Sequence, residues 1–289
     1  MQHGLLAITT LIFSFTIIFS QDTLYISSSI GDFTDASSIS SSRGEFIFVA
    51  DAGTNKIYKY NKECKLLADY GGPGLGKYEL NQPVSIDASN GLDVFIADYL
   101  NNRIVRLDYN LNFIYLFNFN LYNPLAESSK KIFNPISVAL LSSDELFILC
   151  DAGNYNAVRM KEFNEIDIFF AQVSDKVINP IKIVRGNSLD LWILEKTSNE
   201  LMNFNNLGIF VKRIKLPESL KPISLTYFDK TLLILFNTEL YFYDLEKGKF
   251  DRSYFIPELT DLKDINVMDK ETIFISGKRK VYKFNLTEQ

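Results

Sequence analysis

Aspartate and asparagine recur together in this sequence, at points where an apolar run ends. The aspartates are Asp51, Asp98 and Asp151, and an asparagine follows each of them four or five residues later, at Asn55, Asn102 and Asn156. Carboxylate and amide oxygens gathered around one axis can bind Ca²⁺, which prefers oxygen ligands. The same residue types also build tight turns, because aspartate accepts hydrogen bonds from the next backbone N–H groups and asparagine tolerates the left-handed conformation.

The positions equivalent to these aspartates favour a turn over a metal site. Apolar runs that stop at a polar turn occur six times, with equivalent positions at Asp51, Asp98, Asp151, Glu195, Phe236 and Ser276. Phe236 offers no ligand and Ser276 no charge, so the six positions do not form a full ring of carboxylates. A structural role for Asp98 predicts that Asp98→Asn costs roughly 1 kcal/mol or less, because the amide keeps most of the hydrogen bonds of the turn.

The elements that carry these turns repeat with a nearly fixed internal length. A second recurring position lies 14–16 residues before each turn and is proline in four of the six copies: Asp35, Pro83, Pro135, Pro180, Pro222 and Leu262. Proline is tolerated at the first residue of a strand, so this position predicts the start of an inner strand, which is followed by a buried strand and two outer ones. Six such four-stranded antiparallel sheets predict an all-β, six-bladed β-propeller.

The chain order predicts how the ring closes. The blades are expected near residues 34–71, 83–118, 135–173, 180–216, 222–256 and 262–285, within a propeller of residues 21–289. The sixth copy ends one strand short. Residues 23–30 precede the first blade and can supply that strand, which would close the ring and protect an edge that otherwise invites aggregation.

The first two repeats also resemble a known family. The segments "ADAGTNKI" and "ADYLNNRI", with the connecting stretch "GGPGLGKYELNQP" at residues 71–83, are similar to NHL repeats. The third repeat is less similar, and the last three share only the architecture. The resemblance implies a six-bladed propeller of a family whose members are mostly interaction platforms and occasionally enzymes, so it leaves the function open.

The N-terminus and the overall charge limit the location and the partners. Residues 5–19 form a largely apolar run without a charged residue, followed by Ser20, which predicts a signal peptide over residues 1–20 and a secreted or periplasmic protein without a membrane span after cleavage. An uncleaved anchor is the alternative. The net charge is −5, and an acidic chain gains nothing from phosphate backbones, so no nucleic-acid partner is expected.

Histidine and cysteine limit the chemistry further. The only histidine is His3, which lies within the predicted signal peptide, so the mature chain is expected to have no imidazole for a zinc site or a Ser-His-Asp triad. The two cysteines, Cys64 and Cys150, are too few for a disulfide framework. No catalytic residue and no cofactor are therefore predicted, with Ca²⁺ as the one cofactor left open.

The turns and the connections between blades should emerge at the same end of the propeller, and the sequence predicts the binding site there. The candidate residues are Asp51, Asn55, Tyr78, Asp98, Asn102, Arg103, Tyr122, Asp151, Asn156 and Glu195. The favoured function is an exported, non-enzymatic platform that binds a protein, a peptide or a glycan through this face. The alternative is a Ca²⁺-dependent hydrolase or lyase that resembles lactonase-type propellers and uses carboxylates.

Overall fold

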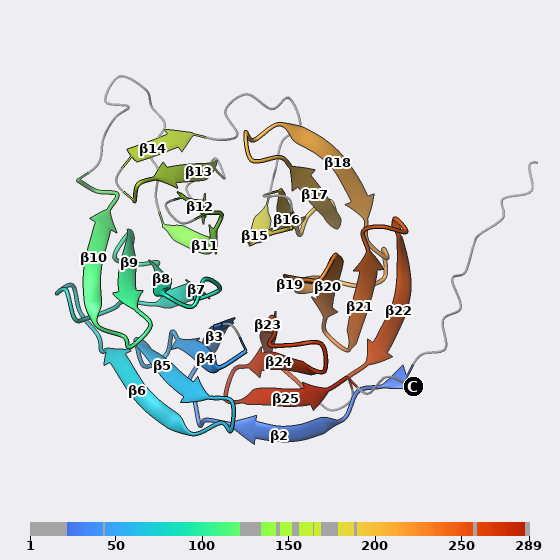
Figure 1. Cartoon of the computed structure of the whole chain (residues 1–289), viewed down its shortest axis with the longest axis horizontal. Coiled ribbons are helices and arrows are strands. Elements are labelled where there is room, and N and C mark those ends of the chain that lie inside the picture. Colours follow the sequence, from blue (N-terminus) through green and yellow to red (C-terminus); the bar gives the residue numbers. More distant parts are fainter. Residues whose placement is uncertain are drawn as a thin grey trace, which may run out of the picture.

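The protein is an all-β, six-bladed β-propeller, as the repeat counting predicts (Figure 1). The computed structural model describes residues 22–42, 44–121, 134–142, 145–151, 156–163, 165–168, 179–187, 190–256 and 259–286, apart from the side chains of residues 156, 167 and 168. The predicted signal peptide lies outside these ranges. No helix long and apolar enough to cross a membrane occurs in the described ranges.

The first three blades are antiparallel meanders that begin at the channel and end at the rim. Blade 1 consists of β3 (Ala36–Ser42), β4 (Phe46–Asp51), β5 (Lys56–Asn61) and β6 (Leu66–Gly71). Blade 2 consists of β7 (Pro83–Asp87), β8 (Asp93–Asp98), β9 (Arg103–Asp108) and β10 (Phe113–Asn118). Blade 3 consists of β11 (Pro135–Leu140), β12 (Glu145–Cys150), β13 (Asn156–Lys161) and β14 (Glu165–Ile168). The prolines stand at the first residue of β7 and β11, as predicted.

The remaining blades repeat this order. Blade 4 consists of β15 (Pro180–Arg185), β16 (Leu191–Glu195), β17 (Glu200–Phe204) and β18 (Phe210–Lys215). Blade 5 consists of β19 (Pro222–Phe228), β20 (Thr231–Phe236), β21 (Glu239–Asp244) and β22 (Lys249–Phe255). Blade 6 contains β23 (Leu262–Val267), β24 (Thr272–Gly277) and β25 (Val281–Asn285) from the C-terminal end of the chain.

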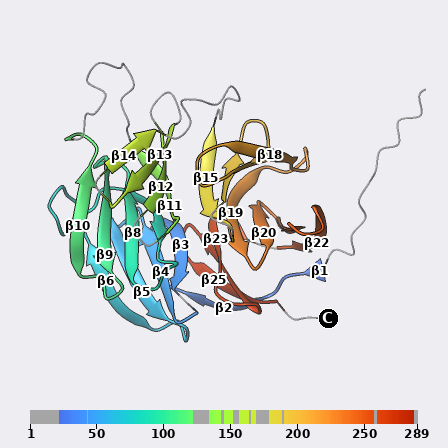
Figure 2. The ribbon, with the colours of Figure 1, turned by 45° about the horizontal axis from the view of Figure 1, so that its top comes forward.

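The N-terminal segment closes the ring, which confirms the predicted closure. Strand β2 (Ile26–Ile30) pairs antiparallel with β25 and so completes blade 6. The preceding short strand β1 (Asp22–Thr23) adds in parallel to β22 of blade 5, a pairing that the sequence analysis did not predict. Both views place β1 beside β22 and β2 beside β25 (Figures 1 and 2). The segment therefore connects the outer edges of two neighbouring blades.

The core is divided among the interfaces between blades. Each of six apolar clusters joins two neighbouring blades, because the buried second strand of a blade packs against the next blade. Phe48, Phe95 and Trp192 occupy the same slot in their blades and are at most 1% exposed. Trp192 belongs to one apolar cluster with Leu225 and Leu232 of blade 5, so it packs between blades 4 and 5.

Buried tyrosines make the stability of the fold sensitive to alkaline pH. Loss of hydration on burial raises the pKa of Tyr60, of Tyr70 and of Tyr241 from 10.0 to about 12. The unfolded chain ionises these phenols first, so the free energy of unfolding should fall as the pH rises from about 10 towards 12. We expect the melting temperature to drop over this interval. A Tyr60→Phe variant should show a smaller drop, and an equal drop would contradict this assignment.

Candidate functional site

Three carboxylates at the ends of second strands, Asp51, Asp98 and Glu195, are buried and accept hydrogen bonds within the protein. They lie on the turn face, which we define as the end of the propeller that carries the turns between the second and third strands and the connections between blades. Asp51 accepts hydrogen bonds from the backbone N–H groups of Thr34 and Asp35, at 3.1 and 2.7 Å, and from Gly53. Glu195 accepts the N–H of Asn179 in the same way, at 2.7 Å. Each carboxylate thus fastens the segment that leads into the inner strand of its own blade.

The asparagines connect one blade to the next. Asn55 and Asn102 have φ values of 59° and 51°, in the left-handed region that the sequence predicts for them. Their side-chain oxygens accept the backbone N–H groups of Gln82 and Asn134, at 2.6 and 2.7 Å, just before the inner strand of the following blade. Asn199 of blade 4 has φ 56° and donates to the carbonyl of Pro217. Asn199 is not among the residues predicted from the sequence, although its offset from Glu195 matches that of Asn55 from Asp51.

Asp98 and Arg103 form a buried ion pair that fixes the connection between blades 1 and 2. Arg103 Nε donates to Asp98 Oδ2 at 2.7 Å, and the two side chains are 4% and 0% exposed. The guanidinium also donates to the carbonyl oxygens of Leu75, Gly76 and Glu79. Burial raises the pKa of the Asp98 carboxyl, against the hydrogen bonds from Asn81, Asn101 and Arg103, which lower it. The pair holds a loop in place, and four of the five N–H donors of the guanidinium are bonded within the protein.

This pairing changes the expected effect of Asp98→Asn. The amide can still accept the N–H of Asn81, but it leaves the Arg103 guanidinium buried without a counter-charge. We therefore expect about 1–3 kcal/mol of destabilisation in urea unfolding, the cost of an incompletely satisfied buried polar group, instead of the smaller loss expected from the sequence. Asp51→Asn is the matched control, because the hydrogen bonds of Asp51 come from backbone N–H groups. Equal losses in the two variants would contradict this role of Arg103.

The remaining predicted residues are spread over the turn face. Tyr78 is 58% exposed on the connection between blades 1 and 2, with its ring centroid 6.1 Å from that of Phe113. Asp151 is partly buried and accepts a hydrogen bond from the Tyr99 hydroxyl at 3.2 Å. Asn156 begins β13, but its side chain lies outside the described part of the structure, as does the whole of Tyr122. In the described ranges, no group of three or more His, Cys, Asp or Glu side chains could hold a metal ion.

A second polar constellation, which the sequence analysis did not identify, lines the central channel. Each of the six inner strands has a bulge at its second residue, which brings its third residue into an equivalent position around the axis. We call these third residues the channel ring: Ser38, Ser85, Ser137, Lys182, Ser224 and Asp264. The signal was available in the sequence, because a serine stands two residues after the recurring inner-strand position in most copies.

The serines of the channel ring link successive blades. The hydroxyls of Ser38, Ser85 and Ser137 accept the backbone N–H groups of Ile86, Val138 and Ile183 in the next blade, at 3.2–3.3 Å. Asp264 makes the same kind of link across the closure of the ring, because its Oδ2 accepts the N–H of Ile39 at 3.1 Å. The ring therefore continues from blade 6 to blade 1.

Lys182 and Asp264 form an ion pair inside the channel. Lys182 Nζ lies 2.8 and 2.7 Å from the two carboxylate oxygens of Asp264 and reaches past blade 5 to do so. The hydroxyls of Ser38 and Ser224 also donate to this carboxylate, which leaves Asp264 2% exposed. The single positive and the single negative charge of the channel ring are therefore paired with each other.

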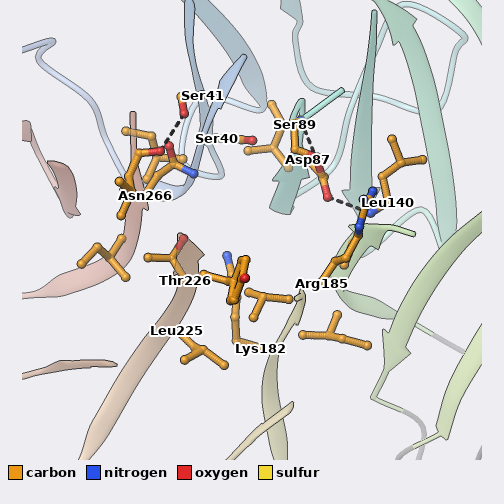
Figure 3. A pocket seen from close by; sticks show the side chains of 18 of the residues that line it. Ser40, Ser41, Asp87, Ser89, Leu140, Lys182, Arg185, Leu225, Thr226 and Asn266 are labelled. Carbon is orange, nitrogen blue, oxygen red and sulfur yellow. Dashed lines mark hydrogen bonds between the residues drawn. The ribbon is translucent and has the colours of Figure 1, made fainter. Parts of the chain in front are cut away.

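A pocket of about 410 Å³ lies above this ion pair. It opens on the hairpin face, which we define as the end of the propeller opposite the turn face, where the first and second strands of each blade are joined. Lys182 forms its floor, since the other lining residues follow the third position of their strands. Figure 3 shows Lys182 and Thr226 on one side of the pocket and Ser40 and Asp87 on the other. The volume is within the usual range for small-molecule sites, about 300–1,000 Å³.

Solved structures with the same architecture come from proteins of different kinds. Virginiamycin B lyase from Staphylococcus aureus is 19% identical, with a TM-score of 0.59 over 84% of this chain and 77% of the lyase. A streptogramin B lyase structure is 15% identical, with a TM-score of 0.63 over 92% and 88% of the two chains. The Cps50 (Swd1) propeller domain of Myceliophteria thermophila is 10% identical, with a TM-score of 0.65 over 91% and 100%.

These similarities concern the fold alone, because all three identities are low. No protein-family model matches the sequence, and no curated protein does. The NHL resemblance therefore stays a prediction, while the six-bladed propeller agrees with the neighbouring structures. One protein with a similar fold is a lyase, and another is the Cps50 propeller domain. The fold alone therefore does not indicate the function, which has to be argued from this chain's own residues.

Proposed function

We propose that this protein is an exported, non-enzymatic β-propeller that binds a protein, a peptide or a glycan by taking one polar group of the ligand into the pocket on the hairpin face. The observation that carries this proposal is the pocket itself, a hollow of about 410 Å³ at the mouth of the channel with charged and hydroxyl side chains in its lining. The turn face is less suited to binding, because the polar groups of Asp51, Asp98 and Asn102 already form hydrogen bonds or an ion pair within the protein.

The residues of the chain also argue for binding without catalysis. A histidine-to-alanine variant of the Staphylococcus aureus lyase, solved with quinupristin, is catalytically inactive. The only histidine of this chain is His3, which precedes the propeller, so a reaction that depends on such a histidine has no counterpart among the blades. The lysine of the channel is held in an ion pair, which does not favour its use as a nucleophile.

The alternative, a Ca²⁺-dependent hydrolase or lyase, has a direct test. Calorimetric titration with Ca²⁺ should give no binding in the micromolar range if the protein is a binding platform. Micromolar binding, together with metal retained through purification, would favour the enzyme. Export is tested separately, because the secreted protein should begin near Gln21 by mass spectrometry.

The binding function is tested by filling the pocket. Val184 lines it, and Val184→Trp should occupy much of the space, whereas Val184→Ile is a conservative control. We expect ligands selected from a glycan array or a displayed random-peptide library to lose affinity for the tryptophan variant and to keep it for the isoleucine variant and for Tyr78→Ala. The absence of any selected ligand would contradict the proposal. Loss with Tyr78→Ala would place the site on the turn face.

A further inference from the structure

The pocket on the hairpin face holds two charged side chains of opposite sign that have no ion-pair partner in the described part of the structure. Asp87 comes from blade 2 and Arg185 from blade 4, and both line the pocket (Figure 3). Lys182 is the third charged residue of the lining, and its charge is balanced by Asp264. We infer that this pocket binds a small zwitterion of the amino-acid class, with its carboxylate on Arg185 and its ammonium on Asp87.

Arg185 is suited to receive the carboxylate. It is the last residue of β15, is exposed at the mouth of the pocket, and forms no ion pair with the described residues. A guanidinium offers a planar set of donors that matches both oxygens of a carboxylate, which makes such pairs stronger than ordinary hydrogen bonds. Lys182, at the floor of the pocket, already donates to both carboxylate oxygens of Asp264, so Arg185 is the better partner for the carboxylate of a ligand.

Asp87 is suited to receive the ammonium. Asp87 Oδ1 accepts the N–H of Ser89 and Oδ2 that of Leu140, both at 2.8 Å, and each oxygen can accept one more hydrogen bond. An ammonium group carries three N–H donors, so it can donate to these remaining acceptor positions of Asp87.

The charges favour a zwitterion over simpler ligands. An anion would be attracted by Arg185 but repelled by Asp87. A cation would be attracted by Asp87 but repelled by Arg185. A neutral sugar could offer hydroxyl groups to both side chains but no counter-charge, so its hydrogen bonds would be weaker than those of two ion pairs. A ligand that carries both charges satisfies both side chains at once. A free amino acid and a short peptide with both termini share this chemistry.

This inference rests on the proposed binding function, and calorimetry with defined ligands tests it. The probes are the standard L-amino acids and diglycine, each compared with its N-acetyl and methyl ester forms, and with glucose as a neutral control. We expect at least one amino acid or diglycine to bind. Its N-acetyl form, which lacks the ammonium, and its methyl ester, which lacks the carboxylate, should each bind about tenfold more weakly or worse, because each loses one ion pair.

Two charge variants assign each end of the ligand. Arg185→Gln should weaken binding of the free amino acid about tenfold but leave binding of the methyl ester unchanged. Asp87→Asn should also weaken binding of the free amino acid about tenfold but leave binding of the N-acetyl form unchanged. The controls are Arg279→Gln and Asp32→Asn, which remove exposed charges on the turn face and should not affect binding. If Asp87→Asn disturbs the fold, the affinities of the wild-type protein for the N-acetyl and methyl ester forms still test the inference.

The outcomes separate this inference from the binding function on which it rests. Binding of glucose or of a selected glycan that Val184→Trp abolishes, with no binding of any amino acid or diglycine, would overturn the zwitterion and leave the binding function standing. Binding of the zwitterion that is equally strong in Arg185→Gln and in the wild type would also overturn the inference. Failure of every probe and of every selected ligand would overturn both.

Discussion

Deletion of residues 22–33 is expected to destabilise the opposite end of the chain. These residues contain Leu24, Ile30 and Phe33, which are at most 6% exposed in the cores between blades 5 and 6 and between blades 6 and 1. Each such side chain contributes roughly 1.5–3 kcal/mol when it is buried. The sum is comparable to the whole stability of a typical domain, about 5–15 kcal/mol. The deletion should therefore unfold blade 6 or the entire ring.

Hydrogen exchange locates this damage. Strand β2 pairs with β25 from Ile26↔Phe284 to Ile30↔Val281, so the amides of Val281 and Phe284 should lose protection although they lie more than 200 residues away in sequence. The truncated protein should also self-associate through the exposed edge of β25. Tyr25→Ser is the control, because that side chain is 76% exposed and its loss should leave protection unchanged. Unchanged protection of β25 after the deletion would argue against ring closure through this strand.

The sequence was sufficient to predict the ring because each repeat specifies its own local structure. An apolar second strand, a carboxylate or asparagine at the turn and a proline at the start of the inner strand are local signals, and they recur at offsets that hardly change. Closure followed from counting strands. The parallel pairing of β1 with β22 could not be predicted in this way, because Asp22 and Thr23 carry no strand pattern of their own and are placed by the closure of the ring.

The site was harder to predict, because the sequence shows which residues recur but not which of them are satisfied. Asp51 and Asp98 stand at equivalent positions of two repeats. The repeat pattern does not reveal that Asp98 forms a buried ion pair with Arg103, five residues later. In the channel, the useful signal was the departure from the repeat. Lys182 and Asp264 stand where the other copies have serine, and only the closed ring brings them within 2.7 Å of each other.

Lys182→Ser is expected to be strongly destabilising, although it introduces the residue that most blades carry at this position. It leaves the Asp264 carboxylate 2% exposed without a cation, and an isolated charge of this kind typically costs about 3–5 kcal/mol. Asp264→Ser should cost less, because Lys182 is 15% exposed and can turn its ammonium towards the water of the pocket. Urea unfolding of both variants measures these losses.

The double variant Lys182→Ser with Asp264→Ser tests whether the two residues stabilise each other. It would give a channel ring of six serines, with no buried charge and with hydroxyls able to accept the N–H groups of the next blade, as Ser38 and Ser85 do now. We therefore expect it to be more stable than Lys182→Ser alone. The exposed pair of Lys230 with Glu246 is the control, since water already solvates both charges and Lys230→Ser should change the stability little. If the two single losses add within about 0.5 kcal/mol, the residues are not coupled and the ion pair does not hold the channel together.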